Sequence, residues 1–145
     1  MDSHQQFAAH GERGAEAEIA AVRRVFERVE RADALAGIEE LMSISHEDVE
    51  MRAYAASQAS GLAAGDLLRG KAAVLDFFRR SKEKGVGIRL RTKGFELAGE
   101  DTVVVRGSIR VARPDASFAE AHVRWRFHFR DGLVDEVGWE PRAGD

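Results

Sequence analysis

The chain has 145 residues, 44% of them hydrophobic and 32% charged, which is the composition of an ordinary globular domain. A single domain of this length buries about two-thirds of the surface that its unfolded chain exposes, so a core and an internal pocket are both feasible. The net charge of -3 gives no overall field that attracts nucleic acid or membrane surfaces. Because the chain has no cysteine, disulfide bonds, thiolate catalysis and cysteine-ligated metal sites are excluded.

The N-terminal half of the sequence predicts three helices. Residues 1–14 are polar, contain two glycines and show no period, so we expect a mobile arm there. Apolar residues then recur at helical spacing from about residue 15, again over 34–42, and again over 71–84, where Gly85 can end the helix. Between the second and third helices we expect a first strand at 48–54, which alternates, and a loop at 55–66.

Four long strands are predicted in the C-terminal half. Residues 88–97, 102–111, 121–130 and 133–139 alternate apolar residues with basic or small ones, which is typical of strands with one buried face. The alternation slips at Lys93-Gly94, which predicts a bulge that bends the sheet. Helices segregated from an antiparallel meander indicate an α+β domain whose helices cover the apolar face of the sheet.

Asp131-Gly132 predicts a tight hairpin between the last two strands. A two-residue type I′ turn would pair Phe129 with Val134, and it would bury Glu136. A three-residue turn, with the glycine as the bulge residue, would pair Phe129 with Leu133 and keep Glu136 on the outer face. We expect the second register because it leaves the carboxylate in solvent, where it can face a basic residue of the neighbouring strand.

Three segments carry a resemblance to known proteins. His46-Glu47-Asp48-Val49-Glu50 opens the first strand, Leu68-Arg69-Gly70-Lys71 leads into the third helix, and residues 125–132 lie near the end. With these motifs, residues 15–141 resemble the nuclear transport factor 2-like superfamily in its SnoaL-like branch, which is related to polyketide cyclases and ketosteroid isomerases. The resemblance implies a cone-shaped, cystatin-like antiparallel sheet wrapped around three helices, a cavity at the open end, and a homodimer. Residues 1–14 would then be an arm before one domain at 15–141, and residues 142–145 a tail.

The inward phase of the strands and the apolar stripes of the helices predict a pocket rich in aromatic side chains. Each of these residues can also be plain core. However, the resemblance places Met51, Trp125 and Trp139 near the cavity mouth, and thioethers and large rings suit a flat hydrophobic ligand. The predicted pocket residues are Phe26, Met51, Tyr54, Phe78, Val105, Val123, Trp125, Phe127, Val137 and Trp139.

Few residues are placed to carry acid-base chemistry. Ketosteroid isomerases use a carboxylate base and an acidic oxyanion donor, and the resemblance puts Met51 and Trp125 at those positions, where neither side chain can do that chemistry. The candidate catalytic residues are His46, Glu50, if a bulge turns it inward, and Tyr54, which could hold a polar group of the ligand. We therefore expect a SnoaL-like domain that binds a hydrophobic small molecule, with no assigned activity. The alternative is an isomerase, cyclase or dehydratase acting on a hydrophobic or polycyclic molecule.

The outward phase of the sheet is basic. Nucleic acid binding is disfavoured, because the aromatic residues that would stack on bases point to the other face. The resemblance implies instead a homodimer through the outer sheet face, whose candidate interface residues are Arg106, Arg110, Arg124, Arg126, His128 and Glu136. The five histidines are scattered and no phosphate-loop motif occurs, so we expect no metal site and no cofactor. With neither a membrane span nor a signal-peptide pattern, a cytoplasmic location is expected.

Overall fold

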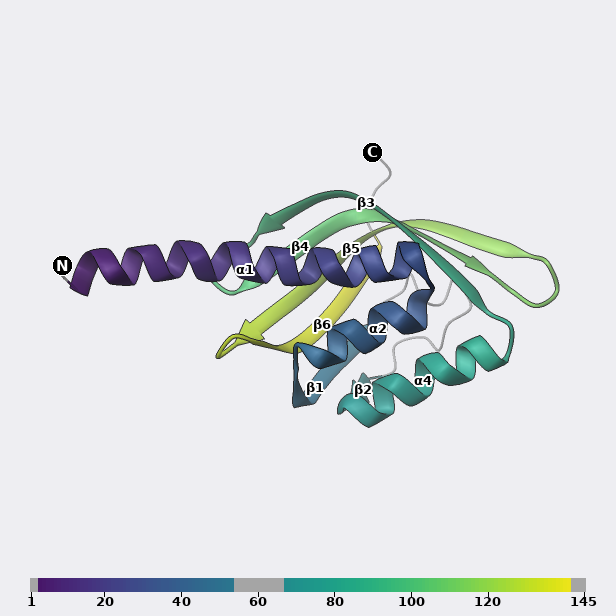
Figure 1. Ribbon diagram of the computed structural model, residues 1–145. Coiled ribbons are helices and arrows are strands. Elements are labelled where there is room, and N and C mark those ends of the chain that lie inside the picture. The colour runs from purple at the N-terminus through teal and green to yellow at the C-terminus, as the bar shows by residue number, and fades with distance from the viewer. Residues whose placement is uncertain (1–2, 54–66, 142–145) are drawn as a thin grey trace.

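The structure, a computed structural model, describes residues 3–53 and 67–141, with side chains described over 16–52 and 67–139. Within these residues the helices gather on one side of a curved sheet (Figure 1). The elements in chain order are α1 (Ser3–Arg31), α2 (Ala34–Ser43), β1 (Ser45–Ala53), β2 (Leu67–Arg69), α4 (Lys71–Glu83), β3 (Gly87–Leu97), β4 (Thr102–Ala112), β5 (Phe118–Arg130) and β6 (Leu133–Pro141).

The described strands form one mixed sheet in the order β2-β1-β6-β5-β4-β3. The predicted antiparallel meander of β3 to β6 is confirmed, as is the α+β class. The last strand, β6, returns beside β1 and runs parallel to it, so the sheet is not wholly antiparallel. Strand β2, which pairs antiparallel with β1, was not predicted because three residues are too few to show an alternation.

Helix α1 begins at Ser3 rather than near residue 15. The backbone is therefore helical over most of the segment that we expected to be a mobile arm. That segment has no apolar stripe, so its hydrophobic period could not reveal a helix, although its alanine, glutamate and glutamine residues favour one. The division into arm, domain and tail stays a prediction, and the predicted loop at 55–66 and tail at 142–145 lie outside the described residues.

The start of α2 is fixed by Asp33, which caps the helix. Its Oδ1 accepts a hydrogen bond from the backbone N–H of Ala36 at 2.8 Å. Its Oδ2 accepts another from Lys82 Nζ at 2.7 Å, which ties α2 to α4. Gly37 is the fourth residue of α2, and a Cβ there would collide with Cγ2 of Val29, so only glycine allows α1 and α2 to approach this closely. These contacts hold the helices as one layer over the sheet.

The β5–β6 hairpin has a register that we did not predict. Asp131 and Gly132 have φ angles of 53° and 82°, which is the conformation of a two-residue type I′ turn, and Phe129 pairs with Val134. The predicted three-residue turn, with Phe129 opposite Leu133, is therefore wrong.

A bulge in β6 restores the inward phase of the strand beyond the turn. The partner of His128 is Glu136, so Asp135 is an extra residue that has no counterpart on β5. From there Phe127 pairs with Val137, and both side chains are buried. The two-residue turn consequently does not bury Glu136, which was the reason for expecting the other register.

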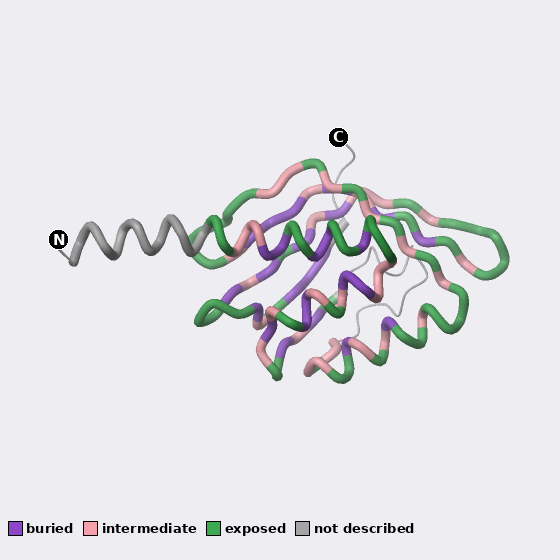
Figure 2. Tube along the Cα trace, viewed as in Figure 1, coloured by how far each residue is buried: buried purple, intermediate pink, exposed green. Residues whose placement is uncertain are grey.

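The core lies between the helix layer and the inner face of the sheet (Figure 2). The predicted inward phase is confirmed: Trp125 and Trp139 face each other across β5 and β6 and are 5% and 7% exposed. Phe26 of α1 makes edge-to-face contacts with Trp125 and Phe127, with ring centroids 5.0 and 6.0 Å apart. The predicted bulge in β3 is present between Thr92 and Gly94.

Candidate functional site

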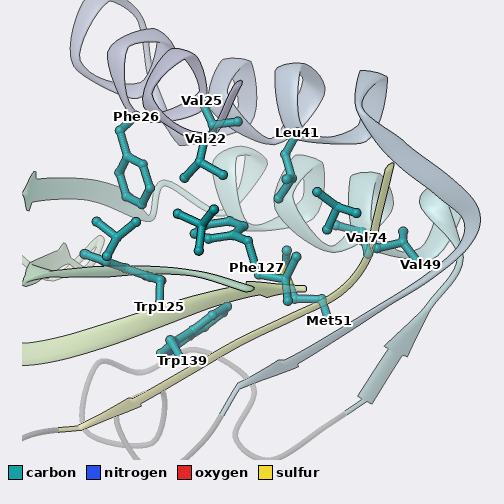
Figure 3. Packing of buried hydrophobic residues seen from close by; sticks show 14 of the residues in the cluster. Val22, Val25, Phe26, Leu41, Val49, Met51, Val74, Trp125, Phe127 and Trp139 are labelled. Carbon is teal, nitrogen blue, oxygen red and sulfur yellow. The ribbon is translucent and has the colours of Figure 1, made fainter. Parts of the chain in front are cut away.

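A cavity of about 70 Å³ lies inside the core, between the helices and the inner face of the sheet. Figure 3 shows side chains from α1 and α2 meeting those of the strands around this region. Every described residue that lines the cavity is apolar. They are Val25, Phe26, Val29, Ala34, Gly37, Ile38, Leu41, Met51, Phe78, Ile88, Leu90, Ile109, Trp125, Phe127, Val137 and Trp139.

Most of the predicted pocket residues lie in this lining. Seven of them contribute to it, namely Phe26, Met51, Phe78, Trp125, Phe127, Val137 and Trp139. Val105 and Val123 are fully buried in the same core but are not part of the cavity wall. Tyr54 lies outside the described residues. The side chains that the alternation of the strands predicted to point inward therefore lie together around one cavity.

Sequence reasoning missed the part of the lining that comes from β3, β4 and α2. Ile88 and Leu90 occupy alternate positions of β3, and Ile109 pairs with Leu90 across β4. Ile38 and Leu41 lie on the apolar stripe of α2. The same period-two and helical spacings that identified the other residues also mark these five. The sequence does not show that β3, the edge strand of the sheet, packs against the helices and so forms part of the cavity wall.

The cavity borders a wider groove, of about 1050 Å³, between the end of α1 and strands β3 and β4. The two hollows share four apolar residues, Val29, Ile88, Leu90 and Ile109. The rest of the groove wall is largely polar, with Glu30, Asp33, Arg89, Arg91, Arg110 and Glu120 among its residues. A molecule with an apolar end in the cavity would therefore meet charged side chains where it leaves the core.

Two of the three candidate catalytic residues, His46 and Glu50, do not reach the cavity. His46 is half-buried, and its Nε2 lies 2.6 Å from the backbone carbonyl oxygen of Arg130, to which it donates. An irregularity in β1 lies between Ser45 and Glu50, yet Glu50 points away from the core and its Oε2 lies 3.9 Å from Nε of Arg69. The irregularity in β1 therefore does not turn this carboxylate toward the cavity. The third candidate, Tyr54, is outside the described residues.

A charged cluster that the sequence did not predict surrounds His128 on the outer face. Its Nδ1 lies 2.5 Å from Oδ1 of Asp135, and its Nε2 lies 3.1 Å from Oδ2 of Asp101 in the β3–β4 turn. Because ionised carboxylates only accept hydrogen bonds, both ring nitrogens donate and the imidazolium form is favoured. The hydrogen bond that His128 donates to Asp135 is the main cause that raises the pKa of His128. Both ring nitrogens are occupied, so this histidine has no free base position.

The candidate interface residues all lie on the outer face of the sheet. Two of the arginines have carboxylates nearby: Nε of Arg106 lies 4.0 Å from Glu96, and Nε of Arg110 lies 3.5 Å from Glu120. A shallow outer groove of about 390 Å³ runs over the others. Its described lining is Thr102, Arg124, Arg126, His128, Glu136, Gly138 and Trp139.

Over the described residues, no three or more histidine and carboxylate side chains are grouped so that they could hold a metal ion. Among the described helices, none is long and apolar enough to cross a bilayer.

Comparison with known families matches one family model, described as SnoaL-like domain, over residues 22–137. Comparison with curated proteins gives no match. The matched residues span from the middle of α1 to β6, so they include every element that contributes to the cavity wall.

Several solved structures share the fold. An NTF2-like protein of unknown function from Burkholderia pseudomallei is 21% identical, with a TM-score of 0.68 over 85% of this chain and 88% of that one. TerC, crystallised with polyporic acid, is 26% identical, with a TM-score of 0.66 over 86% and 90%. A protein from Xanthomonas campestris pv. campestris named as a proposed polyketide cyclase is 19% identical, with a TM-score of 0.67 over 87% and 90%.

Proposed function

The chain belongs to the SnoaL-like domain family, and on that basis we propose that it binds a hydrophobic small molecule in the cavity between its helices and sheet. The observation that carries the proposal is the composition of the cavity wall, in which every described residue is apolar. Ligand sites are concave and mostly apolar, with a small number of polar groups that fix orientation. Protein interiors are normally packed without voids larger than a water molecule, so a cavity of this kind is not explained by ordinary core packing.

The volume of the cavity limits how a ligand can lie. Sites for drug-sized ligands usually measure about 300 to 1,000 Å³, whereas this cavity measures about 70 Å³. We infer that only one ring or alkyl end enters the core and that the remainder lies in the adjoining groove beyond Leu90 and Ile109. Met51 in the wall has a flexible thioether side chain that can move aside to widen the cavity.

One solved structure of similar fold supports a small-molecule ligand. TerC was crystallised with polyporic acid and is 26% identical over most of both chains. An isomerase, cyclase or dehydratase remains the second hypothesis, and it needs an ionisable group beside the ligand. The described cavity wall contains no such group, and neither His46 nor Glu50 reaches it. Binding without an assigned reaction is therefore the better supported function. A cytoplasmic location stays a prediction.

Tryptophan fluorescence tests the proposal, because Trp125 and Trp139 both line the cavity and are the protein's two tryptophans. Tetralin, a neutral bicyclic hydrocarbon, should change their emission in a saturable way when excited above its own absorption. The variant Leu90→Phe adds bulk where the cavity meets the groove, so it should weaken tetralin binding at least several-fold.

The matched control is Leu97→Phe, the same substitution on the same strand at a side chain that is 38% exposed and does not line the cavity. It should bind tetralin as the wild type does. If tetralin and related bicyclic molecules leave the emission unchanged while circular dichroism shows a folded protein, the proposal is wrong. Equal weakening by both substitutions would show that the response arises elsewhere.

We also propose that the protein forms a homodimer through its outer sheet face. The support is the family resemblance and the concentration of cationic side chains there, of which Arg106 and Arg110 keep 42% and 48% of their side-chain surface exposed. Arginines that become desolvated in an interface need carboxylate partners. Glu120 and Glu136 lie on the same face, so a two-fold contact could bring them to the arginines of the partner.

A further inference from the structure

Among the residues that the structure describes, the indole N–H of Trp139 is a buried donor without an acceptor. The residue is 7% exposed, and its Nε1 has no hydrogen-bond partner in that part of the chain, sulfur acceptors included. The side chain lines the cavity on the sheet side of the core, together with Trp125 and Met51 (Figure 3). Folded proteins pair most of their buried polar atoms, so an exception of this kind calls for a physical reason.

Water in the cavity is a poor acceptor for this donor. A buried water normally makes about three hydrogen bonds to polar groups around it. The other described side chains of the wall offer no oxygen or nitrogen acceptor, because they are hydrocarbon, thioether or aromatic, and the indole of Trp125 is only another donor. A water held there could accept from the indole groups and would leave its own two hydrogens without an acceptor, which is costly in an apolar site.

We propose that the ligand itself supplies the acceptor, and that Trp139 Nε1 donates a hydrogen bond to an oxygen on its buried ring. This inference rests on the proposed function and narrows its ligand class. The oxygen is a neutral carbonyl or ether, because no cation lines the described cavity wall to compensate a buried carboxylate or phenolate. The ligand is therefore a neutral cyclic ketone, quinone or ether rather than a pure hydrocarbon or a carboxylic acid.

A pair of probes that differ by one oxygen tests the inference. 1-Tetralone and tetralin have the same bicyclic frame, and only the ketone has an acceptor. Titration calorimetry on the wild type should show the ketone binding about 3- to 10-fold more tightly, the effect of one neutral hydrogen bond. In a ¹H–¹⁵N correlation spectrum the indole proton of Trp139, assigned with Trp139→Phe, should move downfield with tetralone and not with tetralin.

The variant Trp139→Phe keeps an aromatic ring and removes the donor. It should lose the preference for the ketone while binding tetralin at least as tightly as before, because the smaller ring enlarges the cavity. The control Trp125→Phe changes the same cavity and should keep the preference. A preference that survives in Trp139→Phe, or equal binding of both probes by the wild type, would overturn the inference and leave the proposed function standing. Failure of both probes to bind the wild type would count against the proposed function itself.

Discussion

His128 joins three parts of the outer face through its two ring nitrogens. Asp135, the extra residue of the β6 bulge, holds Nδ1, and Asp101 of the β3–β4 turn holds Nε2. Arg130 reaches the same carboxylate of Asp135, with its Nε 3.4 Å from Oδ2. The cluster therefore holds the β6 bulge and the β3–β4 turn to β5 through charge-assisted hydrogen bonds. These are stronger than hydrogen bonds between neutral groups.

The stability of the protein should fall as pH rises through the folded-state pKa of His128. That pKa is raised above its ordinary value of 6.5, chiefly by the hydrogen bond that the ring donates to Asp135. The folded protein therefore holds this proton more tightly than the unfolded chain, so the contribution is complete below about pH 6.5 and is lost at higher pH. Chemical denaturation at a series of pH values, with the pKa of His128 followed by NMR, measures this change.

The variant His128→Gln provides the control, since glutamine does not titrate. Wild type should be more stable than the variant below about pH 6.5, and the difference should shrink above it. The groups that face His128 are Asp101, Asp135, Glu136 and, from α1, Glu18, whose own pKa is raised by burial from 4.5. The charge of His128 lowers the pKa of Glu18, so the difference between the two proteins also includes this coupling. A difference that does not vary with pH would refute the role of His128.

At the residue level, the sequence was sufficient for side-chain direction and insufficient for contacts. Alternation alone placed Trp125, Phe127 and Val137 inside, and all three are buried. The contact between His128 and Asp135 could not be predicted, because it depends on a bulge that shifts the register of β6. Likewise, nothing in the sequence marks Trp139 Nε1 as unpaired, since that property depends on the whole cavity wall.

At the level of elements, the β5–β6 hairpin shows why register is harder to predict than strand position. We weighed a two-residue turn without a bulge against a three-residue turn. The chain combines the two-residue turn at Asp131 and Gly132 with a separate bulge at Asp135. This combination satisfies both the turn preference of aspartate and glycine and the exposure of Glu136, although the expected pairing of Phe129 with Leu133 is wrong.

The other elements differ in how strongly their own residues determine them. Helices α2 and α4 begin and end within a residue or two of the predicted bounds, because an aspartate cap precedes α2 and Gly85, with φ of 82°, follows α4. The start of α1 and the short strand β2 were missed. The first lacks a hydrophobic period, and the second exists only because β1 offers it an unpaired edge.

At the scale of the whole molecule, the two faces of the sheet have opposite character. If the outer face is a dimer interface, the protein should sediment at micromolar concentration with twice the mass of its 16.0 kDa chain. Arg126→Glu reverses a charge on that face and should shift the equilibrium toward the monomer. Arg79→Glu makes the same change at an exposed position of α4, outside the sheet, and should not. A wild type that sediments as a monomer at this concentration would refute the dimer.

The inner face is apolar and encloses the cavity, and the central claim is that a hydrophobic ligand binds there. Methyl-resolved NMR of isoleucine, leucine and valine side chains during a titration with tetralin tests it most directly. Leu90, Ile109 and Val137 line the cavity, whereas Val104 is as buried as Ile109 but lies on the outer face of β4. Tetralin bound in the cavity should cause saturable shifts at the three cavity residues and none at Val104. Shifts centred on Val104 or on exposed methyl groups, or no saturable shift at any residue, would contradict it.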